Sequence, residues 1–206
     1  KRPDRALKTL SKALSLATAD RNDVVYLFSE SNTAAYTTDY QSSTLDWNKD
    51  GVHLIGVGSG SAYSPRARVA FISTYVTASN LFTLSADNCL IANIGFFAGV
   101  ADTHPTGCLQ VTGDRNKVVN CHIAGIGNDS MDIEGAYSLY LNGVQECEFI
   151  DCVIGLNTIA AGTAANSEIL LASTVKNNLF KGCRIHRMIE HGTNHPLVAA
   201  AIFTRG

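Results

Sequence analysis

Residues 116–123 read NKVVNCHI, and the same pattern returns as CEFIDCVI at residues 147–154 and as NLFKGCRI at residues 178–185. These copies are 31 residues apart, and an earlier one, CLIANIGF at residues 89–96, begins 27 residues before the first. Self-similarity at a fixed period of about 20–50 residues is the signature of a repeat architecture. We therefore expect the fold to consist of stacked structural repeats, which we call coils.

Each copy alternates apolar and polar residues, which is the signal of a β-strand. In the first, Val118, Cys121 and Ile123 are apolar, and the alternation shifts by one at Asn120, where we expect a bend. Further short apolar segments lie at residues 81–84, 108–111, 139–141, 168–171 and 200–203. This order of strand, turn, strand, bend and long loop predicts an all-β fold. The predicted fold is a right-handed single-stranded parallel β-helix, a solenoid with coils of about 27–31 residues.

Coils that stack in register place equivalent residues in ladders. We expect Cys121, Cys152 and Cys183 to form an inward ladder of small apolar thiols. A second ladder, at a turn, would contain Cys89, Asn116, Cys147 and Asn178. Asparagine suits such a turn because it tolerates a left-handed backbone and can hydrogen-bond along a stack. Neighbouring coils are about 4.8 Å apart, so disulfides are the alternative, but core thiols are favoured because free cysteine is often buried.

The beginning of the chain does not follow the repeat pattern. Residues 4–18 predict an amphipathic helix with Leu7, Leu10 and Leu14 on one face. We expect this helix to cover the open end of the solenoid, where core residues and strand edges would otherwise be exposed. The polar stretch 29–44 is expected to be a loop.

The predicted organisation is one domain over residues 1–206. It comprises a capping helix at 4–20, opening strands and a loop at 24–80, and regular coils at 81–206. The chain starts without Met and stops at Gly206, inside what the repeat predicts to be a further coil. An open coil end exposes strand edges, so we expect either a longer chain or an assembly in which another subunit covers that end.

The composition argues against several classes of protein. The 206 residues carry a net charge of −2 and Lys and Arg are not clustered, so the electrostatic footprint of a nucleic-acid-binding protein is missing. No apolar run approaches the roughly 20 residues that a membrane span needs. We recognise no signal peptide at the start, and no motif indicates a cofactor.

The order of segments resembles the N-terminal half of pectin-lyase-like β-helix proteins. The resemblance is carried by VVYL at residues 24–27 and GVHLIGVG at residues 51–58. Segments whose sequences resemble those of bacteriophage virion and metagenomic phage proteins lie at residues 6–11, 46–56 and 120–127. That resemblance implies a structural part of a phage particle, made in the bacterial cytoplasm.

The enzymes of that superfamily cleave acidic polysaccharides, and the hydrolases need two carboxylates a few ångströms apart. The best acidic group here is the loop that holds Asp129, Asp132 and Glu134. The paired aspartates and the Gly-His-Gly element of polygalacturonase-like hydrolases are absent from it. A solvated loop whose acids cap turns is the alternative. The outward strand positions are mostly neutral, so we expect no ladder of carboxylates across the coils: Thr83, Ser85, Gln110, Thr112, Tyr140 and Asn142.

Two further groups are weaker candidates. A metal site could be formed by His186, Glu190, His191 and His195. Their order does not match a zinc-helix signature, so histidines that pack or hydrogen-bond within a loop are the alternative. Tyr137 and Tyr140, with Asn142, could form a stacking platform for a sugar ring, although each ring could instead pack on the solenoid.

These observations favour a non-enzymatic structural or adhesive module, associated with a virion, that presents a rigid face of stacked loops. Its expected partners are other copies of itself, other virion subunits or a host surface polysaccharide, without nucleic acid or membrane. The alternative is a glycoside hydrolase or lyase of the pectin-lyase-like fold. Two carboxylates in a cleft, about 5–10 Å apart, would favour that enzyme.

Overall fold

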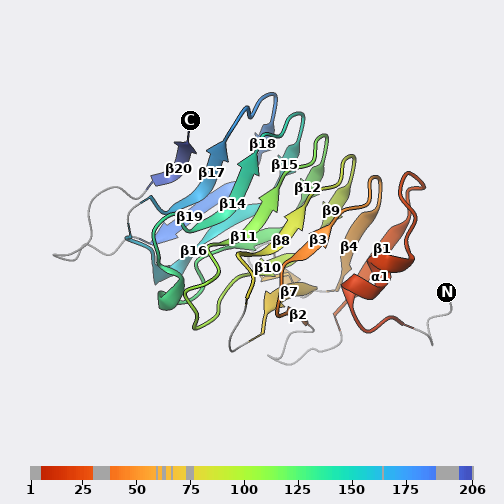
Figure 1. Ribbon diagram of the computed structural model, residues 1–206, viewed down its shortest axis with the longest axis horizontal. Coiled ribbons are helices and arrows are strands. Elements are labelled where there is room, and N and C mark those ends of the chain that lie inside the picture. The colour runs from red at the N-terminus through yellow and green to blue at the C-terminus, as the bar shows by residue number, and fades with distance from the viewer. Residues whose placement is uncertain are drawn as a thin grey trace.

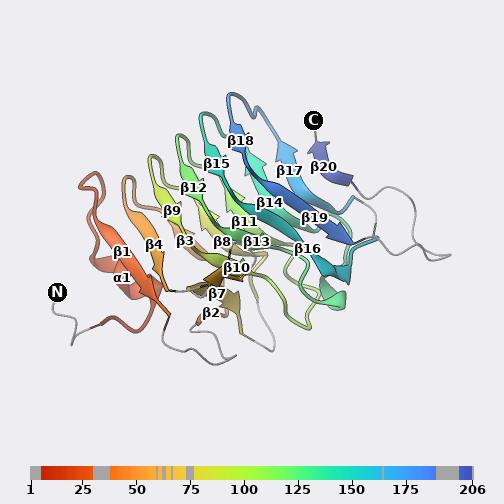
Figure 2. The ribbon, with the colours of Figure 1, turned by 180° about the vertical axis from the view of Figure 1, so that it is seen from behind.

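The computed structural model describes residues 6–29, 38–58, 60–61, 64–65, 67–72, 77–163, 165–188 and 200–205. Three parallel sheets wind around one apolar core to form a right-handed solenoid (Figures 1 and 2). We call the three sheets A, B and C. Each coil passes first through sheet C, then through sheet A and then through sheet B. The predicted fold class, an all-β parallel β-helix with one short helix near the N-terminus, is confirmed.

Each sheet has six strands within the described residues. Sheet A contains β1 (Val24–Phe28), β4 (His53–Val57), β9 (Leu90–Ala92), β12 (Lys117–Val119), β15 (Glu148–Ile150) and β18 (Leu179–Lys181). Sheet B contains β2 (Thr38–Gln41), β7 (Arg68–Phe71), β10 (Gly95–Phe97), β13 (His122–Ala124), β16 (Val153–Ala160) and β19 (Arg184–Met188). Sheet C contains β3 (Leu45–Trp47), β8 (Asn80–Leu84), β11 (Gly107–Val111), β14 (Tyr137–Asn142), β17 (Ser167–Ala172) and β20 (Ala200–Arg205).

Among the described residues, four elements lie outside these sheets. Strands β5 (Gly60–Ser61) and β6 (Ser64–Pro65) pair antiparallel, and a short 3-10 helix spans Asp129–Met131. The α-helix α1 (Leu10–Leu16) packs against β1 at the N-terminal end of the solenoid (Figure 1). In the described part of the chain, no helix is long and apolar enough to cross a membrane.

Helix α1 is shorter than the predicted 4–18. It begins after Thr9, whose backbone is extended and whose Oγ1 accepts a hydrogen bond from the Lys12 N–H at 3.2 Å. A side-chain acceptor at this N-cap position satisfies a free N–H of the first turn and so favours the start of the helix there. The buried face therefore consists of Leu10 and Leu14, whereas Leu7 remains 38% exposed.

One prediction about the opening segment is wrong. We expected residues 29–44 to form a loop, but Thr38–Gln41 is strand β2 at the edge of sheet B. Its backbone pairs in parallel with β7, so pairing with a neighbour decides its conformation although its sequence lacks apolar alternation. Residues 30–37 lie outside the described part of the chain.

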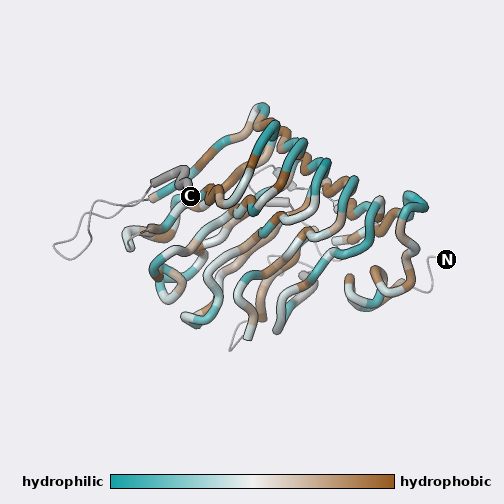
Figure 3. The backbone as a smooth tube through the Cα atoms, turned by 45° about the horizontal axis from the view of Figure 1, so that its top comes forward, coloured by the Kyte–Doolittle hydropathy of each residue, from teal (hydrophilic) through white to brown (hydrophobic). Residues whose placement is uncertain are grey.

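Left-handed residues turn each coil at two corners. Between sheets C and A the positive φ falls on Asn88, Arg115, Glu146 and Asn177, and between sheets A and B on Asn93, Asn120, Asp151 and Gly182. Figure 3 shows hydrophilic residues recurring at these turns from coil to coil. We expected the left-handed backbone at the asparagines of the turn ladder, but it lies one residue earlier. The ladder asparagines instead use their side chains.

The turn ladder is held together by side-chain amides. Asn116 accepts a hydrogen bond from the Cys89 N–H at 2.8 Å and donates to Ala86 O and Gly113 O at 2.8 and 2.9 Å. Two coils later along the chain, Asn178 accepts a hydrogen bond from the Cys147 N–H at 2.8 Å. These bonds satisfy backbone groups at a corner where the strand ladders are interrupted.

The inward ladder places Cys121 and Cys152 at 0% exposure, while Cys183, on the last complete coil described, is partly exposed. All six cysteines are free thiols. The sulfur atoms of Cys121 and Cys152 instead lie near backbone carbonyl oxygens, at 3.3 Å from Val119 O and 3.4 Å from Ile150 O.

Replacing Asn116 with alanine tests the turn ladder. The Asn116→Ala variant leaves a buried N–H and two buried carbonyl groups without their partner, so we expect the free energy of unfolding to fall by about 3 kcal/mol. Urea denaturation measures this change. The control Asn157→Ala removes an exposed asparagine from β16 and should change the free energy by less than about 0.5 kcal/mol. Equal effects in both variants would contradict a structural role for the ladder.

Candidate functional site

The outer face of sheet C presents a row of neutral side chains. Thr83, Gln110 and Tyr140 are partners in register on β8, β11 and β14, and all three are partly exposed. An acidic residue, Asp46 on β3, lies next to Thr83 in register before this neutral row and accepts a hydrogen bond from the Ser85 hydroxyl at 2.6 Å. This face therefore offers hydroxyl, amide and phenol groups, spaced by the strand separation of about 4.8 Å.

The two tyrosines of this region have different roles. Tyr137 is only 6% exposed, and its ring lies over Gly107, where a Cβ atom would come within 2.1 Å of the ring. Tyr140 meets the Tyr137 ring edge to face, with centroids 5.2 Å apart. Burial raises the pKa of Tyr137 above its usual range. Tyr137 thus supports Tyr140, which is the more exposed of these two rings. Asn142 accepts a hydrogen bond from the Ser173 hydroxyl at 3.1 Å.

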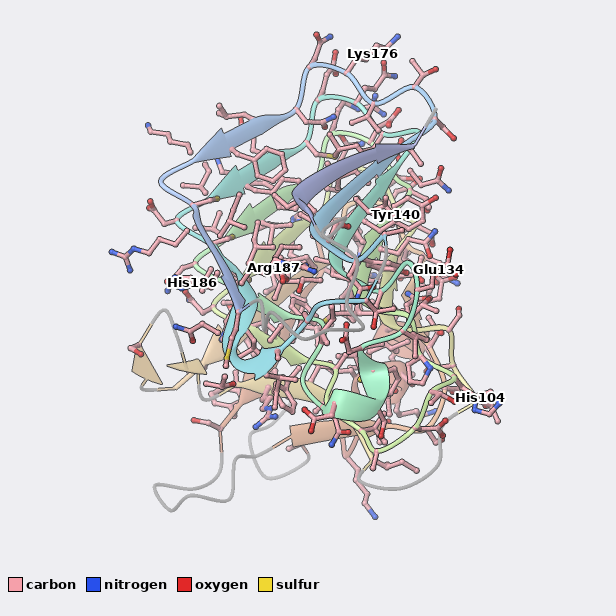
Figure 4. The ribbon with its side chains drawn as sticks, turned by 90° about the vertical axis from the view of Figure 1, so that its left-hand side faces the viewer. His104, Glu134, Tyr140, Lys176, His186 and Arg187 are labelled. Atoms are coloured by element: carbon pink, nitrogen blue, oxygen red, sulfur yellow. The ribbon has the colours of Figure 1, made fainter. Side chains whose placement is uncertain are left out.

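The acidic loop is held mainly through Asp132. Its carboxylate accepts hydrogen bonds from the backbone N–H groups of Gly162 and Thr163, both at 3.1 Å, and from the Asn166 amide. Asp132 therefore fastens its own loop to the corresponding loop of the next coil. Asp129 and Glu134 are exposed, and Figure 4 shows Glu134 and Tyr140 on the same side of the solenoid.

The histidine cluster is only partly described. His186 lies on β19, on the opposite side of the solenoid from Tyr140 (Figure 4). Glu190, His191 and His195 lie outside the described residues. Within the residues that the structure describes, no group of three or more His, Cys, Asp or Glu side chains is arranged to hold a metal ion.

A ladder of carboxylates does exist, contrary to our expectation. Asp50 accepts from the Asp87 N–H and Asp87 from the Asp114 N–H, each at 2.8 Å. Asp114 then accepts from the backbone N–H of Gln145 at 3.0 Å, and Arg115 pairs with Asp87 at 2.8 Å. These aspartates lie in turns, two residues before the turn-ladder positions, and not on strand faces. The sequence signal for this ladder is the recurrence of an aspartate shortly before successive strands of sheet A, as at Asp50, Asp87 and Asp114.

The sequence did not reveal a buried polar cluster inside the last coils. The Ser138 hydroxyl donates to the Glu168 carboxylate at 2.5 Å, and the Arg187 guanidinium pairs with the same carboxylate at 3.3 Å. The side chains of Glu168 and Arg187 are 2% and 6% exposed, and Figure 4 shows Arg187 inside the coil. Arg187 also donates to Ala161 O at 2.6 Å. Among the described residues, its Nε atom has no partner.

Gly155 is required for this cluster. Its φ is +93°, and a Cβ atom there would lie 2.5 Å from a Glu168 carboxylate oxygen. Burial raises the pKa of Glu168 above its ordinary value of 4.5, although Ser138 and Arg187 oppose the shift. The cluster cannot touch a polymer at the surface because it is enclosed, so it serves the interior of the coil.

The pH dependence of stability tests this assignment. A carboxyl group with a raised folded-state pKa stabilises fully below the unfolded value of 4.5, and this stabilisation is lost as the pH rises through the folded-state pKa. The Glu168→Gln variant lacks the titration. We therefore expect the unfolding free energy of the wild type to fall relative to that of the variant across this window, in urea denaturation at a series of pH values. Glu134→Gln, at the surface, is the control, and parallel profiles for wild type and Glu168→Gln would contradict the assignment.

Comparison with known proteins gives little beyond the architecture. No protein-family model and no curated protein matches the chain. The structure is similar to the crystal structure of a pectin methylesterase mutant in complex with a hexasaccharide, with a TM-score of 0.46 and 11% sequence identity. The match covers 86% of this chain and 63% of that one, so this chain spans less than two thirds of the enzyme's length.

Proposed function

We propose that this chain is a non-enzymatic adhesive module that binds a glycan on the outer face of sheet C. The observation that supports this proposal is the row of Thr83, Gln110 and Tyr140, which are in register and partly exposed. Sugar hydroxyl groups pair with neutral donors and acceptors, and the apolar face of a sugar ring stacks on an aromatic side chain. Tyr140 is the ring that can do so here, with Tyr137 behind it.

The rigidity of the face favours binding. The strands that carry these side chains pair on both sides along sheet C, so their spacing is fixed before a ligand arrives. A preorganised surface loses less conformational entropy on binding than a mobile one. An extended polysaccharide lying along the solenoid axis would meet one side chain of the row on each coil.

The placement of the acidic groups favours binding over cleavage. Glycoside hydrolysis uses one carboxylic acid and one carboxylate on either side of the scissile bond. Asp132 is already occupied by three donors from the neighbouring loop, and Glu168 is enclosed. Asp129 and Glu134 are the acids of this region that remain exposed, and the alternative proposal, a polysaccharide hydrolase or lyase, would depend on them.

The biological setting is part of the same proposal. We propose a host surface polysaccharide as the glycan and a phage particle as the assembly, with other copies of the chain or other virion subunits as neighbours. This setting is supported by the resemblance of the sequences at residues 46–56 and 120–127 to those of phage proteins. The glycan-binding face itself does not depend on it.

A retention assay tests the binding face. We expect the wild type to be retained by at least one polysaccharide in a panel of bacterial and plant polymers, and Tyr140→Ala to bind about ten-fold more weakly, which corresponds to about 1.4 kcal/mol. Tyr26→Ala is the matched control, because Tyr26 is 55% exposed but lies on sheet A. Failure of the wild type to bind any polymer, or equal losses in both variants, would contradict the proposal.

The same incubations, analysed by mass spectrometry for released oligosaccharides, distinguish binding from cleavage. We expect no released product. Product that disappears in Asp132→Asn or in the exposed Glu134→Gln variant would overturn the adhesive proposal in favour of the enzyme. Circular dichroism of each variant shows whether a loss of product reflects a loss of fold.

A further inference from the structure

The outer face of sheet A carries a column of aliphatic side chains. Four consecutive strands place them in register along the solenoid: Ile55 on β4, Ala92 on β9, Val119 on β12 and Ile150 on β15. All four are partly exposed. Each of these strands is flanked on both sides by another strand of sheet A (Figure 2). The exposure therefore belongs to the face and is not a consequence of an end of the solenoid.

This column differs from the corresponding row of sheet C. There the outer side chains in register are Thr83, Gln110 and Tyr140, all of which carry polar groups, whereas the column of sheet A offers only aliphatic groups. Contiguous apolar side chains on an outer surface mark sites of contact with other proteins. A face made of paired strands fits another sheet, because two sheets pack about 10 Å apart with their side chains interdigitated.

A second row of the same face, two residues before the column on each strand, carries polar groups. Lys117 and Glu148 form an ion pair at 2.8 Å, and their side chains are 49% and 42% exposed. His53 on β4 accepts a hydrogen bond from the Leu90 N–H through Nδ1 at 3.0 Å. In the neutral ring the proton therefore lies on Nε2, which is a donor. The row thus has an N–H donor on β4 and a carboxylate on β15.

A two-fold axis parallel to the strands, between β9 and β12, makes this face complementary to itself. Such an axis reverses the order of the strands in the second copy but keeps positions along each strand. Strand β4 of one copy then meets β15 of the other, and β9 meets β12. Ile55 faces Ile150 of the second copy, and Ala92 faces Val119, so all four members of the column are covered by aliphatic groups.

The polar row favours the same arrangement. His53 of one copy faces Glu148 of the other, so an N–H donor meets a carboxylate. Lys117 lies over Leu90, which its alkyl chain can cover while its ammonium group stays beside Glu148. A two-fold axis parallel to the solenoid would instead press Lys117 and Glu148 against the aliphatic column, where removing the charges from water is costly.

We propose that the outer face of sheet A binds a second copy of this chain through this two-fold contact. Contacts in which both copies use the same patch are the commonest kind in homo-oligomers. The six described strands of sheet A span five spacings of about 4.8 Å, or about 24 Å. This size lies at the low end for specific interfaces, so the dimer should be reversible, with a Kd on the order of 10–100 µM.

Sedimentation velocity of the wild type, from about one tenth to about ten times this Kd, tests the contact. We expect a reversible shift from monomer to dimer. Ile55→Lys and Ile150→Glu should each raise the Kd by at least about ten-fold, because each homodimer would bury a charge against an isoleucine. Thr158→Lys is the matched control, since Thr158 is exposed on β16 of sheet B, and it should dimerise like the wild type.

An equal mixture of the two weakened variants tests the register. In the mixed dimer the two introduced charges face each other and the second pair of isoleucines is retained. The mixture should therefore associate about ten-fold more tightly than either variant alone, which is about 1.4 kcal/mol. Tighter association in the mixture also shows that both variants are folded.

A wild type that stays monomeric throughout this range would overturn the proposal, and the face would then belong to a different partner. A dimer that Thr158→Lys weakens as much as Ile55→Lys, or a mixture that associates no more tightly than its components, would contradict the two-fold arrangement. The contact uses sheet A, whereas the proposed glycan face lies on sheet C. Because glycan retention measured below the dimer Kd compares monomers, either proposal can fail without the other.

Discussion

Coils that lie in register require the backbone N–H groups of the turns to find acceptors, and many of these acceptors lie on the neighbouring coil. The strands meet this demand with their own ladders, and some corner residues do so as well, as when the Asn88 N–H donates to Asp114 O at 3.1 Å. Other corner N–H groups donate to side chains: to Asp50, Asp87 and Asp114 in one stack, and to Asn116 and Asn178 in the next. The recurrence of Asp and Asn in this sequence is thus a requirement of stacking, since an unpaired N–H at an enclosed corner would destabilise the fold.

This constraint shapes the chemistry that is available at the surface. Several acidic side chains are used between coils, as in the aspartate stack and in the contact of Asp132 with the 162–166 segment. Glu168 is enclosed with Arg187. The outer face of sheet C is left with largely neutral side chains and one supported ring, Tyr140. The proposal of glycan binding rests on this neutral surface.

Much of the architecture could be predicted from the repeat, because period-two alternation marks the regular strands of sheets A and C directly. Strand β2 was missed because pairing, and not apolar alternation, determines its conformation. The aspartate stack was not predicted because its members stand in turns, outside the period-two alternation that marks the strands. Glu168 and Arg187 are 19 residues apart in sequence, and their contact depends on how one coil closes upon itself, which no local pattern encodes.

Amide hydrogen exchange of the folded protein tests the stacking account most directly. If turn side chains on neighbouring coils accept these hydrogen bonds, the amides of Cys89, Asp87, Asp114 and Cys147 should be protected to a similar degree as those of the adjoining strands. Exchange of these amides at the rate of unprotected loop amides, with the strands still protected, would contradict the account. The carboxylates would then be free for other chemistry.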